Sequence, residues 1–196
     1  MFLETTIISF IVVKIRKGRL EYLENTVIRA WYLLILAALI QGVLVFFNRF
    51  DFTVGNYIFE NYFFHLHFLS YILMLVCIIL NINKHFMKLF FIGLILNFIV
   101  IFANGGQMPV SIEGRKGIKN PSSIELPISD FNIKHKSLDK NTRLVYLADI
   151  ILIPEPYPFP KVISIGDIFL ILGVFVFSQE AMVVKKRRKP KVLSQF

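Results

Sequence analysis

Long apolar runs alternate with short polar segments along this chain of 196 residues. A helix needs about 20 mostly apolar residues to cross a hydrocarbon core of about 30 Å, because each residue advances the helix by about 1.5 Å. Four runs meet or approach that length: Val27–Phe47, Tyr57–Ile82, Met87–Ala103 and Ile165–Val184. Since 56% of the residues are also hydrophobic, the pattern predicts an integral membrane protein whose spans are helices.

A shorter apolar run opens the chain at Phe2–Val13, and basic residues follow it from Lys14 onward. A cleavable signal peptide carries positive charge before its apolar core and small residues at a cleavage site. This run has neither, so we predict an uncleaved anchor over residues 2–16 with its N-terminus outside. The alternative is an amphipathic helix that lies in the membrane interface. With the anchor counted, the predicted fold is an all-α bundle of five transmembrane helices in one membrane domain, residues 1–196.

The net charge of +9 is concentrated beside the predicted spans. Basic residues cluster in 14–29, in the turn 83–88 and in the tail 185–196, and these regions share one side of the membrane if every long run spans it. The positive-inside rule makes that side cytoplasmic. The sequence therefore predicts a multi-pass protein of the bacterial plasma membrane, with a cytoplasmic C-terminus and a partly ordered extracytoplasmic loop over residues 104–161.

The basic tail also predicts a partner. Each basic residue just inside a span attracts anionic lipid headgroups by about 1 kcal/mol. In a soluble protein the same net charge would suggest nucleic acid, but clusters at the ends of spans set topology and bind lipid. We therefore expect anionic lipids, and no nucleic acid, at Lys185, Lys186, Arg187, Arg188 and Lys189.

Polar and small side chains inside the predicted spans mark contacts between helices. Hydrocarbon offers a polar group no partner, so such groups face the bundle. Gln41 and Asn97 are expected to join neighbouring helices by hydrogen bonds. Ala38 and Gly42 stand four residues apart, which predicts a face that another helix approaches closely.

The sequence Asn104-Gly105-Gly106-Gln107-Met108-Pro109-Val110 directly follows a predicted span. One interpretation is a helix end, in which the glycines take left-handed conformations and the proline prevents the helix from continuing. The other is a binding site, in which an unwound glycine-rich backbone exposes carbonyl groups to a cation or a polar headgroup. The helix end is favoured. The candidate residues of this motif are Asn104, Gly105, Gly106, Met108 and Pro109.

The last predicted span opens with Ser164-Ile165-Gly166-Asp167. A serine followed three residues later by an acidic residue, just before an apolar run, has the spacing of a capping box. The Asp167 carboxylate would also lie at the positive end of the helix dipole. An intramembrane aspartyl protease carries Gly-x-Gly-Asp, but serine stands at position 164 and no second span supplies a Tyr-Asp partner. We therefore reject that activity and keep Ser164, Gly166 and Asp167 as a candidate motif.

A further polar group opens the run Tyr57–Ile82. Glu60 and His67 share one helical face, and together with Asn97 they are candidates for a polar pocket that binds a proton or a small ligand. The favoured alternative is that Glu60 and His67 only satisfy their polar groups at the outer interface. His65 and His67 diverge by about 200° on a helix, so one metal ion cannot bind both. We expect no metal site and no cofactor.

The loop of residues 104–161 is expected to fold back on the bundle. Arg143–Ile153 is too apolar to remain in water, since burial gains about 25 cal/mol per Å² of apolar surface. The alternating prolines of residues 154–160 predict an extended polyproline II arm that returns the chain to the membrane. Asp167 is expected to accept hydrogen bonds from the Ser164 amide and from the turn at residues 104–107.

These motifs together resemble a family of bacterial multi-pass membrane proteins that is catalogued only as a domain of unknown function. The resemblance covers nearly the whole chain. Besides the two motifs above it includes Lys17-Gly18-Arg19-Leu20, His135, Thr142-Arg143-Leu144 and Leu147-Ala148-Asp149. The family typically has two glycines where this chain has Lys17-Gly18, and usually a glycine where Ala148 stands. The resemblance implies the fold and the compartment, but no mechanism.

The sequence does not favour an enzyme, because no acid, base and nucleophile converge by spacing. It predicts instead a non-enzymatic accessory or interaction component, whose loop contacts another membrane protein or a second copy of the chain. The alternative is a carrier or binding protein for a small solute or a lipid, which would use the polar groups in the outer half of the bundle.

Overall fold

The structure is a computed structural model that describes residues 2–49, 53–111, 135–157 and 160–183. These residues are mostly helical. The long helices are α1 (Phe2–Ile15), α2 (Tyr32–Arg49), α3 (Thr53–Leu80), α4 (His85–Ala103) and α7 (Ile165–Met182), and the short 3-10 helices are η1 (Leu20–Asn25) and η3 (Val145–Leu147). The strands are β1 (Met108–Val110), β2 (His135–Ser137), β3 (Ile151–Ile153) and β4 (Lys161–Ile163).

Three helices in the described part of the chain are long and apolar enough to cross a membrane. They are Asn61–Leu80 within α3, His85–Ala103 and Ile165–Met182. The apolar part of α2, Tyr32–Phe47, is shorter than a span requires. α1 has 14 residues. The helical class predicted from the sequence is therefore confirmed, while the five-span bundle stays a prediction.

The chain divides into two compact units. The first unit combines Met1–Val27 with Val174–Phe196, and the second is Ile28–Gly173. In the first unit, Val13 of α1 forms an apolar core with Ala181 and Met182 of α7. The Arg16 guanidinium also donates to the Gln179 side-chain oxygen at 2.8 Å. The basic tail Lys185–Lys189, with its predicted lipid contacts, lies outside the described residues.

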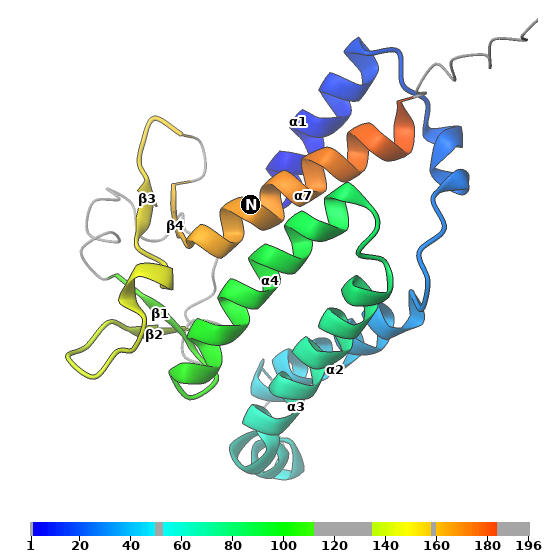
Figure 1. The fold of residues 1–196 in the computed structure, drawn as a ribbon. Coiled ribbons are helices and arrows are strands. Elements are labelled where there is room, and N and C mark those ends of the chain that lie inside the picture. The colour runs from blue at the N-terminus through cyan, green and yellow to red at the C-terminus, as the bar shows by residue number, and fades with distance from the viewer. Residues whose placement is uncertain (1, 50–52, 112–134, 158–159, 184–196) are drawn as a thin grey trace, which may run out of the picture. The chain divides into compact units, whose positions relative to one another are not determined.

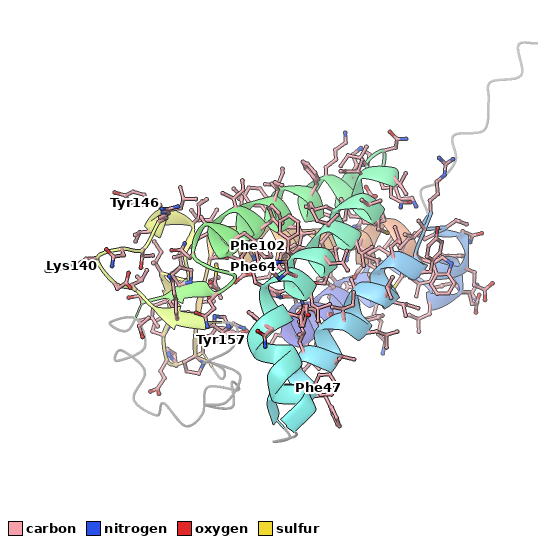
Figure 2. The ribbon with its side chains drawn as sticks, turned by 90° about the horizontal axis from the view of Figure 1, so that it is seen from below. Phe47, Phe64, Phe102, Lys140, Tyr146 and Tyr157 are labelled. Carbon is pink, nitrogen blue, oxygen red and sulfur yellow. The ribbon has the colours of Figure 1, made fainter. Side chains whose placement is uncertain are left out.

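In the second unit, α3 and α4 form an antiparallel hairpin joined by a short turn (Figure 1). Aromatic rings fill the contact between them, since Phe64 and Phe68 of α3 meet Phe98 and Phe102 of α4 with ring centroids 5.1–5.5 Å apart. Phe64 and Phe102 lie edge to face in the middle of Figure 2. Such rings bury large apolar areas and orient one another.

α2 begins at Tyr32 and not at Val27, because residues 29–31 form a turn. Ala38 and Gly42 are exposed, and a Cβ atom at Gly42 would meet no atom of the described residues within 4 Å, so the close approach of another helix at this face stays a prediction. α2 packs on α3 through the adjacent face, where Ala37 and Leu44 are buried.

The segment between α4 and α7, which we call the α4–α7 connection, contains two small sheets. β1 pairs with β2 in parallel, with Met108 opposite His135. β3 pairs with β4 in antiparallel register, with Ile151 opposite Ile163. The chain therefore reverses between β3 and β4, and the Tyr157 amide donates to the Pro154 carbonyl at 3.2 Å in the turn. This hairpin replaces the extended polyproline II arm that the sequence predicted.

Candidate functional site

α4 and α7 approach each other closely at glycines. A Cβ atom at Gly93 of α4 would lie 2.6 Å from the carbonyl oxygen of Gly166 in α7. A Cβ atom at Gly166 would overlap the side-chain oxygen of Asn97, and one at Gly173 would lie 2.9 Å from the ring of Phe90. Small residues let two membrane helices approach in this way. Gly166, a predicted motif residue, therefore makes room for a second predicted residue, Asn97.

The start of α7 is capped as the Ser-x-Gly-Asp spacing predicted. The Ser164 amide donates to Asp167 Oδ2 at 3.2 Å, and the Asp167 amide donates to Ser164 Oγ at 3.0 Å. These reciprocal bonds satisfy two donors that the first turn of a helix leaves without partners. The predicted capping box is confirmed.

Asn97 of α4 joins this cap from the neighbouring helix. Its Nδ2 donates to Asp167 Oδ1 at 3.0 Å, and its Oδ1 accepts from Ser164 Oγ at 3.0 Å. Asn97 is 8% exposed and Ser164 is fully buried. The Asp167 carboxylate thus uses one oxygen for its own helix and the other for α4. The Asn97 link takes the place of the hydrogen bond from the turn at residues 104–107 that the sequence suggested.

The Asn104 motif ends α4 as a helix cap. Gly105 and Gly106 have φ of 78° and 86°, and the Gly106 amide donates to the Ile101 carbonyl at 2.9 Å. This bond closes a Schellman turn, in which left-handed residues satisfy the last helix carbonyls. The favoured interpretation of the glycines is confirmed. Met108 and Pro109 follow as strand β1, and both are buried.

The Asn104 side chain has a second role, because it holds the backbone of a distant arginine. Its Nδ2 donates to the Arg143 carbonyl at 2.9 Å, and its Oδ1 accepts from the Arg143 amide at 3.0 Å. Nδ2 also donates to the Val100 carbonyl at 2.8 Å. The carboxamide therefore pairs with Arg143 as a neighbouring strand would, and fixes the connection to the end of α4.

An apolar core completes this attachment. Val100 and Ile101 of α4, Met108 of β1 and Ala148 are buried together, and Leu147 packs against them. The sequence predicted that the loop folds back on the bundle, and the described part of the connection does so. In Figure 1 the strands gather where α4 ends and α7 begins.

Half-buried His135 and buried Asp149 form a polar pair beside this core. His135 Nδ1 lies 3.6 Å from Asp149 Oδ2, and the Asp149 side chain is 8% exposed. Asp149 is also held through its backbone, because its amide donates to the Pro109 carbonyl and its carbonyl accepts from the Ser111 amide, both at 2.9 Å. Burial raises the pKa of the Asp149 carboxyl to about 8, and the negative charge of Asp167 adds to the rise.

Two of the predicted pocket residues, His67 and Asn97, make hydrogen bonds in different groups. His67 of α3 is buried, and its Nδ1 lies 2.7 Å from Nε2 of Gln41 in α2. The same Gln41 nitrogen also donates to the Ser70 hydroxyl. Asn97 belongs to the cap of α7 instead. Gln41 and Asn97 thus join neighbouring helices, as predicted. Glu60 lies in α3, but its side chain is outside the described residues.

Asn81 is a structural residue that the sequence analysis missed. Its Oδ1 accepts from the Arg29 amide at 2.8 Å, and its Nδ2 donates to the Arg29 carbonyl and to the Cys77 carbonyl, each at 2.8 Å. The signal that could have identified it is an asparagine directly after an apolar helix, the position that Asn104 also holds. The single cysteine, Cys77, is buried here and donates its thiol to the Arg29 carbonyl at 3.6 Å.

The fold and this site define a mostly helical protein that has, in its described residues, three helices long enough to cross a membrane and a connection fixed to two of them. Within that class, the chain belongs to the family of unknown function DUF5317, whose family model matches residues 25–179. The expected membership of a domain family without known function is therefore confirmed.

One relative agrees with this assignment. An uncharacterised protein of Thermotoga maritima is 33% identical over 109 residues, which cover 56% of this chain and 60% of the relative. The chain thus spans less than two thirds of the length of that relative. No solved structure matches the chain.

Proposed function

We propose that this protein is a non-enzymatic component of the bacterial plasma membrane, which presents the α4–α7 connection on the outer side to a membrane-protein partner. The observation that carries the proposal is the use of the polar groups at the end of the bundle. Asn97 donates a hydrogen bond to Asp167, which also accepts one from the Ser164 amide. Asn104 donates to the backbone carbonyl of Arg143. A catalytic acid or base must instead reach a substrate.

The turn after β2 is the surface that suits such a partner. Asp139 Oδ1 accepts from the Asn141 amide at 2.9 Å and from the Thr142 hydroxyl at 2.8 Å, and the Thr142 amide donates to the Asp139 carbonyl at 3.1 Å. Lys140 is exposed at the edge of the molecule, far from the helices in Figure 2. The turn is thus preorganised by its own side chains, which lowers the entropic cost of binding.

Site-specific crosslinking in living cells tests this function. A photoreactive amino acid at Lys140 is expected to yield one discrete protein adduct. Asp139→Ala removes the acceptor that orders the turn, so the adduct should weaken severalfold while the amount of protein in the membrane stays the same. The same photoreactive residue at Leu39, which is 60% exposed on α2, is the control for random collisions in the membrane. Equal adducts at the two positions would contradict the proposal, and an adduct with the mass of two copies would make the partner a second chain.

A further inference from the structure

Two segments far apart in the chain share a local structure. Arg29-Ala30-Trp31-Tyr32-Leu33 and Arg143-Leu144-Val145-Tyr146-Leu147 both read Arg-x-x-Tyr-Leu. In each segment the residue after the arginine has φ of 55°, a left-handed conformation that residues other than glycine rarely adopt. In each, a tight turn follows, since the Leu33 amide donates to the Ala30 carbonyl and the Leu147 amide to the Leu144 carbonyl.

The same device holds both segments in place. Asn81 binds the amide and the carbonyl of Arg29, and Asn104 binds those of Arg143, at 2.8–3.0 Å. Each asparagine also donates to the carbonyl four residues earlier, at 2.8 Å. The backbone of both arginines is therefore fixed to a helix end, and the left-handed residue next to each is held by its surroundings.

The two helix ends lie at opposite ends of one hairpin. Asn81 directly follows α3, and Asn104 directly follows α4. Because α3 and α4 are antiparallel and each is long enough to span a membrane, a membrane that both helices cross would have the two asparagines at its opposite faces. One Arg-x-x-Tyr segment would then be fixed at each face.

Both segments expose side chains that suit the lipid headgroup layer. Trp31 and Tyr32 are 58% and 62% exposed, Tyr146 is 82% exposed, and both arginines are exposed. Tryptophan and tyrosine concentrate at membrane interfaces, because one end of each ring is apolar and the other is polar. A guanidinium group binds the phosphate of a headgroup with two parallel hydrogen bonds.

We propose that the two Arg-x-x-Tyr segments are phospholipid anchors, one in each leaflet, in which the arginine binds a headgroup phosphate and the aromatic residues enter the interface beside it. The occupant is lipid because each segment is held by an asparagine that directly follows an apolar helix long enough to span. The pair of anchors would fix how deep the bundle lies in the membrane. This role does not depend on a protein partner for the connection.

The single tryptophan provides the test. The full chain is reconstituted in vesicles of phosphatidylcholine and phosphatidylglycerol whose acyl chains carry bromine, a fluorescence quencher, either near the headgroup or near the bilayer centre. Trp31 is expected to be quenched at least about twofold more strongly by the shallow bromine than by the deep one. In a Trp31→Phe, Tyr146→Trp variant, the tryptophan at position 146 should behave in the same way.

A matched variant, Trp31→Phe with Lys140→Trp, places the probe on the exposed turn of the same connection, where neither bromine should quench it. Arg143→Gln in the variant with tryptophan at position 146 should reduce shallow quenching, whereas Arg143→Lys should keep part of it. Quenching at position 146 no stronger than at position 140 would overturn the proposal, and a protein crosslink at position 146 would assign the segment to a protein partner. Unchanged quenching after Arg143→Gln would overturn the phosphate contact.

Discussion

A methyl group at position 166 would occupy the place of the Asn97 side-chain oxygen. That oxygen accepts from Ser164, and the same carboxamide donates to Asp167. One backbone position thus decides whether α4 and the cap of α7 can share their hydrogen bonds. The requirement is steric, because Gly166 lies in a helix where alanine would otherwise be the better residue.

Gly166→Ala is therefore expected to lower the free energy of unfolding by about 1–3 kcal/mol, the usual cost of overpacking a closely packed contact. Gly42→Ala is the matched control, since it is also a helical glycine but has open space around its Cβ. There the better helix propensity of alanine should raise stability, by up to about 1 kcal/mol. Thermal unfolding of both variants in one detergent measures the difference. Equal melting temperatures of the Gly166→Ala and Gly42→Ala variants would show that the close approach of α4 to α7 at Gly166 does not contribute to stability.

The two positions at which the resemblance leads us to expect glycine differ in backbone conformation. Lys17 has φ of 58°, so the lysine adopts a conformation that glycine adopts freely. Gly18 beside it has no room for a side chain, because a Cβ atom would lie 2.6 Å from Val13 Cγ1. Ala148 has φ of −71°, which any residue adopts. A residue other than glycine therefore strains the backbone at position 17 and does not strain it at position 148.

At the scale of the elements, buried polar groups hold the connection to the helices. Asn104 binds it to α4, and Asn97 binds α4 to α7. Asp149 differs from these residues, because its Oδ1 is buried and has no hydrogen-bond partner among the described residues. A buried carboxylate is stable when it is protonated or paired. The connection should therefore respond to pH.

The sign of this response follows from the raised pKa. An unfolded aspartate titrates near pH 3.9, whereas the pKa of folded Asp149 is about 8. Between about pH 4 and pH 8 the folded segment keeps a proton that the unfolded one has lost, so its stability falls as the pH rises through this window. Asp167 is the charged group that raises the pKa further, and His135 is the titratable group nearest to the carboxyl, with Nδ1 3.6 Å from Asp149 Oδ2.

Hydrogen exchange can detect this change. The protection factors of the Asp149 and Ser111 amides, which bond across the strands, should decrease from about pH 6 to about pH 8.5. Asp149→Asn keeps the shape and removes the titration, so its protection factors should vary much less with pH. A wild-type protection factor that stays constant over this range would contradict the argument.

At the scale of the whole molecule, the arrangement of the charges predicts the orientation. Lys84 lies in the turn between α3 and α4, and Lys140 lies on the connection beyond the far end of α4. If α4 spans the membrane, these two positions are on opposite sides. The positive-inside rule places Lys84 in the cytoplasm.

Labelling of single cysteines tests this orientation. In a Cys77→Ala background, a cysteine at Lys140 should react with a membrane-impermeant maleimide in intact cells. A cysteine at Lys84 should react only after the membrane is permeabilised. The reverse pattern would invert the protein in the membrane, and reaction at both positions in intact cells would show that α4 does not span it.

The sequence by itself determined the features that depend on near neighbours in the chain. Apolar runs predicted α3, α4 and α7, because length and hydropathy alone decide whether a helix can cross hydrocarbon. The cap at Ser164 and Asp167 and the glycine turn after α4 were also predicted, since their hydrogen bonds join residues three to five positions apart.

Only the tertiary structure decided which distant groups meet. Asn97 and Ser164 are separated by 67 positions, and Asn104 and Arg143 by 39. A polar residue in an apolar run needs a partner, but its spacing does not say which partner, because that depends on how the helices cross. The same holds for β3 and β4, whose pairing turned the predicted polyproline arm into a hairpin. It also holds for the start of α2 at Tyr32. Just before this start, Asn81 binds the backbone of Arg29, although the two residues are 52 positions apart.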